Sequence, residues 1–297
     1  MGQQKGFDNL NPSFRIDAMV AQAYEDGTIR ERDRLSVVLA VTLTGVTLLR
    51  FVELPTFSWS VRQILGSPLG LTITGDWVQV FLMMGLVASG TFSLLQTHPD
   101  RASRERPFLF YLITPTLGAL WCALILVGVS SWPLWLGSLV GSGILIGLLM
   151  HLTYRSLSPH GAGFASARTL LNIAAYLLSF ALFSLSLRAR GRALVTGPVV
   201  LLLSGAWALE LLSAGAMKQN AVWLFSGVIA LQSAELAWVL GYWPITPWMG
   251  AIMLTLALYL SVGVCYQYLL GKLTRQVVIE FSLLTLAVFL LVLFIRP

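Results

Sequence analysis

The chain has 297 residues, of which 57% are hydrophobic and 11% charged, and its formal net charge is +6. A soluble globular domain carries about 25% charged residues, so this composition excludes an ordinary soluble protein. The basic residues stand in short polar segments beside apolar runs, which is typical of membrane orientation signals and excludes a nucleic-acid partner. Both cysteines, Cys122 and Cys265, lie inside apolar runs, so we expect no disulfide framework and no metal site.

Apolar runs of about 20 residues follow one another from residue 35 to the C-terminus. Backbone polar groups must be satisfied internally in lipid, and runs of this length that are apolar on every face predict helices. We therefore expect an all-α, polytopic transmembrane bundle of nine spans, or eight if the last run, interrupted by Glu280, is not a span. The expected spans are 35–54, 76–96, 108–129, 134–154, 169–187, 194–214, 221–241, 248–270 and 277–295.

The distribution of basic residues predicts the orientation of the bundle. With the N-terminus inside, thirteen of the 19 Lys and Arg residues fall on the inner side and six on the outer side. The positive-inside rule favours this arrangement and a bacterial inner membrane protein with its N-terminus in the cytoplasm. The basic turn at 188–192 fits this topology least, because it would lie outside.

Two segments differ from simple spans. Residues 1–33 are polar and mixed in charge, and contain no signal peptide, which predicts a cytoplasmic tail. Residues 34–297 then form the transmembrane domain. Within it, residues 55–75 are too apolar for an exposed tether, so we expect an ordered outer loop that folds onto the bundle, with a turn at 64–70. It could act as a lid, as a docking surface or only as a cover for helix ends.

Ionisable residues within spans are candidates for functional sites, because a charge at the bilayer centre costs about 2.5–3.5 kcal/mol or more. Arg50 in the first span and Glu235 in the seventh are expected at similar depth, with Gln232 adding polarity one turn from Glu235. An Arg50–Glu235 ion pair would satisfy both charges. Such a pair could be structural, or it could bind a proton or a ligand.

Glu210 and His151 form a second candidate pair near the inner ends of their spans. Snorkelling of both side chains to the interface is the alternative. His151 could also be the single axial ligand of a haem or a chlorophyll-type pigment, since imidazole is a common axial ligand. A lipid or a pigment is therefore the cofactor to consider, although the sequence demands none. The motifs of hydrolases, zinc proteases and phosphate-binding loops are missing, so an enzyme is the weaker expectation.

Three short stretches resemble an uncharacterised family of multi-spanning membrane proteins of Chloroflexota, known as a domain of unknown function. They are Ile64–Gly70, Thr97–Pro99 and, more loosely, Tyr242–Pro247. The resemblance covers most of the chain and implies no activity. It does imply a host membrane rich in photosynthetic or respiratory complexes.

Three classes of function remain open. The first is a non-catalytic accessory or scaffold subunit of a larger membrane complex, photosynthetic or respiratory, in contact with lipids and other membrane subunits. The second is a transporter or channel for a small or lipophilic solute, although such pathways usually carry more polar lining than these spans offer. The third is a lipid-modifying membrane enzyme, which would have to use His151 and Glu210.

Overall fold

The fold is known from a computed structural model. It describes residues 32–52, 57–64, 67–73, 75–96, 98, 107–157, 163–188, 193–214 and 219–294. The expected N-terminal tail, except for its last two residues, and most of the basic turn at 188–192 lie outside these residues.

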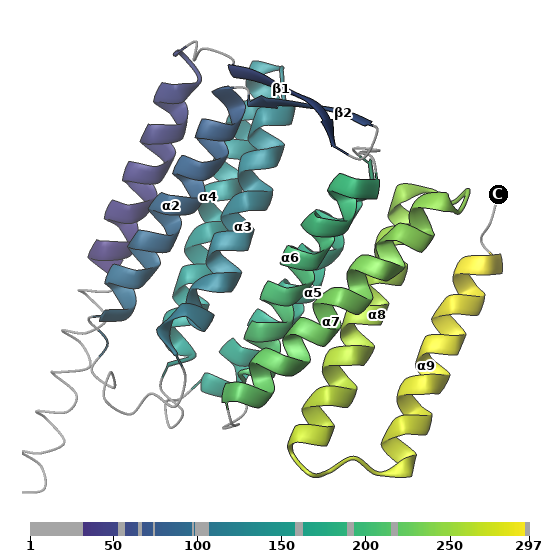
Figure 1. The fold of residues 1–297 in the computed structure, drawn as a ribbon. Helices are drawn as coiled ribbons and strands as arrows, with labels where there is room; N and C mark the ends of the chain where they lie inside the picture. Colours follow the sequence, from purple (N-terminus) through teal and green to yellow (C-terminus); the bar gives the residue numbers. More distant parts are fainter. Residues whose placement is uncertain are drawn as a thin grey trace, which may run out of the picture.

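The described chain is a bundle of long helices, which confirms the predicted all-α, polytopic fold class (Figure 1). The first helix covers residues 32–49. It is followed by α2 (Gly75–Gln96), α3 (Phe108–Gly128), α4 (Trp132–Arg155), α5 (Phe164–Arg188), α6 (Ala193–Leu212), α7 (Gln219–Tyr242), α8 (Pro247–Leu269) and α9 (Arg275–Phe294). Of the described helices, the seven from α2 to α8 are long and apolar enough to cross a membrane. The count of nine spans and the inward orientation of the N-terminus stay predictions.

The helix boundaries follow from local chemistry. Proline occupies the first turn of α4 and of α8, where its fixed φ suits a helix and its missing N–H costs no hydrogen bond. Gly271, which follows the C-cap residue Leu270 of α8, has a φ of 66°, which suits glycine at the end of a helix. The first helix ends earlier than expected, so Arg50 lies in the turn that follows residue 49 and not inside a span.

A β-hairpin precedes α2. Strand β1 (Phe57–Ile64) pairs with β2 (Ser67–Ile73) in antiparallel register, with Phe57 opposite Ile73 and Ser60 opposite Gly70. The two residues between the strands, within the predicted turn at 64–70, lie outside the described part. Figure 1 shows the hairpin at one end of the bundle, called here the hairpin end. The other end, where α2 ends and α3 begins, is called the opposite end. A lid or docking role for the hairpin stays a prediction.

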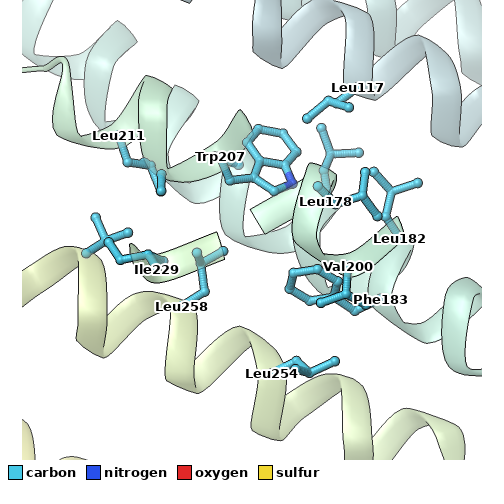
Figure 2. Close-up of a cluster of buried hydrophobic side chains, with 14 of the residues drawn as sticks. Leu117, Leu178, Leu182, Phe183, Val200, Trp207, Leu211, Ile229, Leu254 and Leu258 are labelled. Atoms are coloured by element: carbon cyan, nitrogen blue, oxygen red, sulfur yellow. The ribbon is translucent and has the colours of Figure 1, made fainter. Parts of the chain in front are cut away.

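Two clusters of apolar side chains fill the bundle. The first joins the helix at 32–49 to α2, α3 and α4 through residues such as Val46, Met83 and Ile146. The second joins α3 and α4 to α5, α6, α7 and α8, and Figure 2 shows Trp207 of α6 in it, beside Leu117 and Leu178. Because α3 and α4 contribute to both clusters, they connect the two halves of the bundle.

Glycines mark the closest helix contacts. A Cβ on Gly90 of α2 would lie 2.3 Å from Val38, so the small residue lets α2 approach the helix at 32–49. Gly143 and Gly147 of α4 likewise face Leu43 and Leu39 of that helix. Gly143 and Gly147 thus form the surface of α4 on which the first helix packs. Helix α9 lies at the edge of the bundle and packs on α8 (Figure 1).

Candidate functional site

A buried carboxylate cluster lies at the opposite end of the bundle, where α3, α5 and α6 meet. Glu210 is in the last turn of α6 and is only 5% exposed. Thr114 of α3, which is also buried, donates its hydroxyl to the Glu210 carboxylate oxygen Oε2. Hydrogen bonds to a charged group are stronger than neutral ones, so this contact ties α3 to α6.

Arg168, the fifth residue of α5, provides the positive charge of the cluster. Its Nη2 donates to the backbone carbonyl of Glu210 at 3.3 Å, and the Ser213 hydroxyl donates to the same carbonyl at 2.7 Å. The last carbonyls of a helix carry partial negative charge and lack helical partners. Arg168 and Ser213 therefore cap α6, and Arg168 offsets the repulsion between the Glu210 carboxylate and the negative end of its own helix.

Two donors near this cluster have no hydrogen-bond partner among the described residues: Nε of Arg168 and Nε1 of Trp207. Trp207 precedes Glu210 by about one turn of α6, and its indole lies between α3 and α5 beside Leu117 and Leu178 (Figure 2). The indole is thus held by apolar packing alone, whereas the Glu210 carboxylate is held by hydrogen bonds between helices.

His151 is half-buried on α4, one turn before Arg155. Nearby, His98 stacks edge-on against Tyr154 with ring centroids 4.6 Å apart, so histidine and tyrosine gather at this end of the bundle. The predicted His151–Glu210 pair and the use of His151 as a pigment ligand stay predictions. No group of three or more His, Cys, Asp or Glu residues in the described chain could hold a metal ion.

Arg50 lies elsewhere, at the hairpin end. Its Nη2 donates to the Ser130 carbonyl at 3.3 Å, and its guanidinium carbon lies 5.7 Å from the centre of the Trp135 ring, a cation–π contact. Trp132 stacks on Trp135 and on Phe51, which completes an aromatic cluster around the start of α4. Arg50 therefore fastens the end of the first helix to α4.

The predicted Arg50–Glu235 ion pair is wrong. The first helix packs against α2 and α4, whereas Glu235 is on α7 in the other half of the bundle (Figure 1). Equal depth suggested the pair, but depth does not determine which helices are neighbours.

Glu235 is exposed on the outer face of α7. No hydrogen bond or ion pair joins it to another residue of the described chain. Gln232, one turn earlier, is also exposed, and its Oε1 accepts a hydrogen bond from Ser261 of α8 at 3.1 Å. This Gln232–Ser261 bond lies beside Glu235 and leaves the carboxylate facing outward.

Sequence reasoning named Glu210 but missed its partners Thr114 and Arg168. Arg168 could have been found, because α5 ends at Arg188 and the consecutive antiparallel helix α6 begins at Ala193. Arg168 and Glu210 are therefore at similar distances from the connection between the two helices. Thr114 carries no such signal, since α3 is not a sequence neighbour of α6. It becomes a partner only through the packing of α3 on α5 and α6.

A bundle of this kind, with seven described helices fit to cross a bilayer, defines a multi-pass integral membrane protein with helices in contact with lipid. Residues 56–295 match the family described as "Protein of unknown function (DUF5656)". The chain therefore belongs to the DUF5656 family, which confirms the resemblance to a domain of unknown function. Comparison with curated proteins gave no match, and comparison with solved structures gave none.

Proposed function

We propose that this protein is a non-catalytic accessory or scaffold subunit of a larger complex in a bacterial inner membrane. The observation that carries the proposal is the exposed Glu235 on α7, which has no partner within the described chain. An ionisable side chain in the membrane is costly unless it is paired or reaches water. A neighbouring subunit would supply the missing partner.

The packing of the bundle supports a scaffold more than a transporter. Several buried hydroxyls donate to carbonyls one turn earlier on their own helix, as Thr91 does to Val87, Thr153 to Leu149 and Ser204 to Val200. Groups bonded in this way do not offer themselves to a solute. The space between the helices is filled by the two apolar clusters, and substrate pathways usually need polar side chains along a continuous route.

The remaining unpaired buried polar atoms of the described chain do not suggest a pathway either. One such atom lies in each helix from α2 to α7: Gln79 Nε2, Thr116 Oγ1, Trp135 Nε1, Arg168 Nε, Trp207 Nε1 and Ser226 Oγ. Two more belong to α8, Thr246 Oγ1 at its N-cap and Thr255 Oγ1 nine positions later, on opposite sides of the helix. A helix that lines a pathway would present several such atoms along one face. The lipid-modifying enzyme is supported only by the Glu210 cluster, whose carboxylate is already bonded to Thr114.

The test is isolation of the tagged full-length chain from its native membrane in a mild detergent, followed by mass measurement of the particle. A subunit should be recovered with a stoichiometric partner in a particle heavier than the 32.5 kDa chain with its detergent. Recovery of the chain alone would contradict the proposal, and so would saturable solute flux through vesicles that contain this chain only.

A further inference from the structure

We infer that the outer face of α7 binds a transmembrane helix of another protein, and that this helix places a lysine or arginine against Glu235. The inference rests on the proposed function and deepens it, because it names the surface and the chemistry of the partner. The face consists of Leu224, Val228, Leu231, Glu235 and Val239, all exposed.

The geometry of this face suits a helix. The five residues are spaced by three or four positions, so they form one stripe along α7, with Glu235 near the middle of its width. The other side of α7 carries buried residues such as Ile229 and Ser233, which face the bundle. The stripe is thus an apolar surface with one carboxylate, the kind of surface on which transmembrane helices associate through packing and polar contacts.

The depth of Glu235 makes the carboxylate costly in lipid. It precedes the end of α7 at Tyr242 by seven residues, or about 10 Å along the axis. A helix of 24 residues exceeds the hydrocarbon thickness of about 30 Å by only a few Å at each end. Glu235 therefore lies inside the hydrocarbon, with Trp238 between it and the interface. Its short side chain reaches less far than the lysine or arginine chains that snorkel from such depth.

Charge complementarity selects the occupant. A basic residue on the facing helix would form an ion pair in a low-dielectric surrounding, where the attraction is strong and exposure to lipid alone is unfavourable. A second copy of this chain does not offer one at that depth. Within the described residues, the basic side chains lie within the first or last five residues of a helix or in the segments between helices, as with Arg50, Arg155 and Arg168. Two copies related by a twofold axis on α7 would instead bring two carboxylates together.

Gln232 adds a polar contact on the same flank. Its Oε1 is occupied by Ser261, so its side-chain amide group is oriented by that bond and has donors to offer a neighbour. A helix bound to the stripe would meet this amide about one turn from the ion pair. We expect a hydroxyl, amide or backbone carbonyl of the partner opposite Gln232.

The experiment is photo-crosslinking in native membranes from a photoreactive residue at Leu231, with the same residue at Val140 as the matched control. Leu231 and Val140 are 55% and 61% exposed, on α7 and α4. Crosslinked peptides are then sequenced by mass spectrometry. We expect Leu231 to crosslink a transmembrane segment of another protein that carries Lys or Arg, and Val140 to crosslink lipid.

The role of the Glu235 charge is tested by measuring the yield of the crosslink from Leu231 in charge variants. Glu235→Gln should lower its yield at least about tenfold, because loss of one member of a buried ion pair strongly weakens binding. Glu280→Gln is the control, since Glu280 is an exposed carboxylate on α9 that accepts a hydrogen bond from Gln276. It should leave the yield unchanged. Glu235→Lys combined with an acidic residue in the partner should restore the crosslink.

The outcomes separate this inference from the proposed function. Crosslinks from Leu231 only to lipid, to a second copy or to a segment without a basic residue would overturn the inference, and so would an unchanged yield with Glu235→Gln. If the complex still has its full mass in those cases, the proposed function stands. If the chain is isolated alone, both fail.

Discussion

Glu210 and Glu235 are both glutamates on neighbouring helices, but one is buried and the other is exposed. Glu210 is buried where α3, α5 and α6 meet, with Thr114 on its carboxylate and Arg168 on its backbone carbonyl. Glu235 is exposed on the outer face of α7, without a hydrogen bond or ion pair in the described chain. The chain itself provides a partner for the Glu210 carboxylate. Our proposal assigns the partner of Glu235 to a neighbouring helix.

This difference indicates two separate tasks. The Glu210 cluster joins three helices and contributes to the stability of the single chain. The Glu235 face contributes little to that stability, because its side chains are largely exposed, and its role would be in assembly. Substitutions at the two positions should therefore have different effects on the isolated protein and on the complex.

The largest effect on the isolated protein is expected from Glu210→Leu. The change removes the acceptor of the buried Thr114 hydroxyl, whereas Arg168 keeps the backbone carbonyl that it contacts. An unsatisfied buried donor costs about 1–3 kcal/mol, and a change of side-chain shape in a packed site adds about 1–3 kcal/mol. Thermal unfolding in detergent should show a clear loss of stability. Glu235→Leu is the matched control and should leave the midpoint nearly unchanged. Equal losses of stability from Glu210→Leu and Glu235→Leu would contradict the assignment of Glu210 to the stability of the chain and of Glu235 to assembly.

Thr114→Val tests the link between α3 and α6 at nearly constant volume. Removing the hydroxyl deprives Glu210 of its donor, which costs about 1.5–3 kcal/mol for a bond to a charged group. Thr169→Val is the control, because Thr169 is exposed and bonds only to Ala165 of its own helix. It should change the unfolding free energy by less than about 0.5 kcal/mol. An unchanged unfolding free energy for Thr114→Val would contradict the hydrogen bond between Thr114 and Glu210 as a stabilising contact.

Substitutions of Gly205, which contacts the inner face of α7, and of Gly227, on its exposed side, compare the packing of the two faces of this helix. A Cβ on Gly205 of α6 would lie 3.2 Å from the Cβ of Ala230 on the inner face of α7. Gly205→Ala should therefore cost about 1 kcal/mol through overpacking. Gly227 lies on the exposed side of α7 with nothing within 4 Å of its Cβ position. Gly227→Ala should be neutral or stabilising by up to about 1 kcal/mol. A larger loss of unfolding free energy from Gly227→Ala than from Gly205→Ala would contradict the described packing of α7.

The smallest effect is the coupling between Arg50 and Glu235. Arg50→Leu should cost about 1 kcal/mol, from the loss of the cation–π contact with Trp135 and the bond to Ser130. Because the two side chains are in different halves of the bundle, Arg50→Leu and Glu235→Gln should be additive within about 0.5 kcal/mol. A double-mutant cycle on the unfolding free energy measures this. A double variant that is more stable than the sum of the two single losses predicts would indicate that Arg50 and Glu235 form an ion pair after all.

Much of the fold could be predicted because hydropathy along the chain directly reports the helices. The expected span 108–129 is α3 within one residue, and 248–270 is α8 within one residue. The side of each helix that faces inward could not be predicted in this way. Lipid and protein interior are both apolar, so on α7 the buried Ile229 and the exposed Leu231 look alike in the sequence.

The candidate sites show the same limit. Glu210 and Glu235 are single acidic residues in apolar helices, and nothing local separates the buried one from the exposed one. The Arg168–Glu210 contact follows from the register of two consecutive helices. The partners Thr114 and Trp135 follow only from the packing of helices distant in sequence, which hydropathy does not encode.

The most direct test of the account is the mass of the particle isolated in mild detergent from native membranes that express the wild-type chain, Glu235→Gln or Glu280→Gln. Thermal unfolding of each isolated chain is measured in parallel. We expect a stoichiometric complex for the wild type and for Glu280→Gln. For Glu235→Gln we expect a chain without its partner, at unchanged stability. An intact complex with Glu235→Gln, or a wild-type chain recovered alone, would contradict the account.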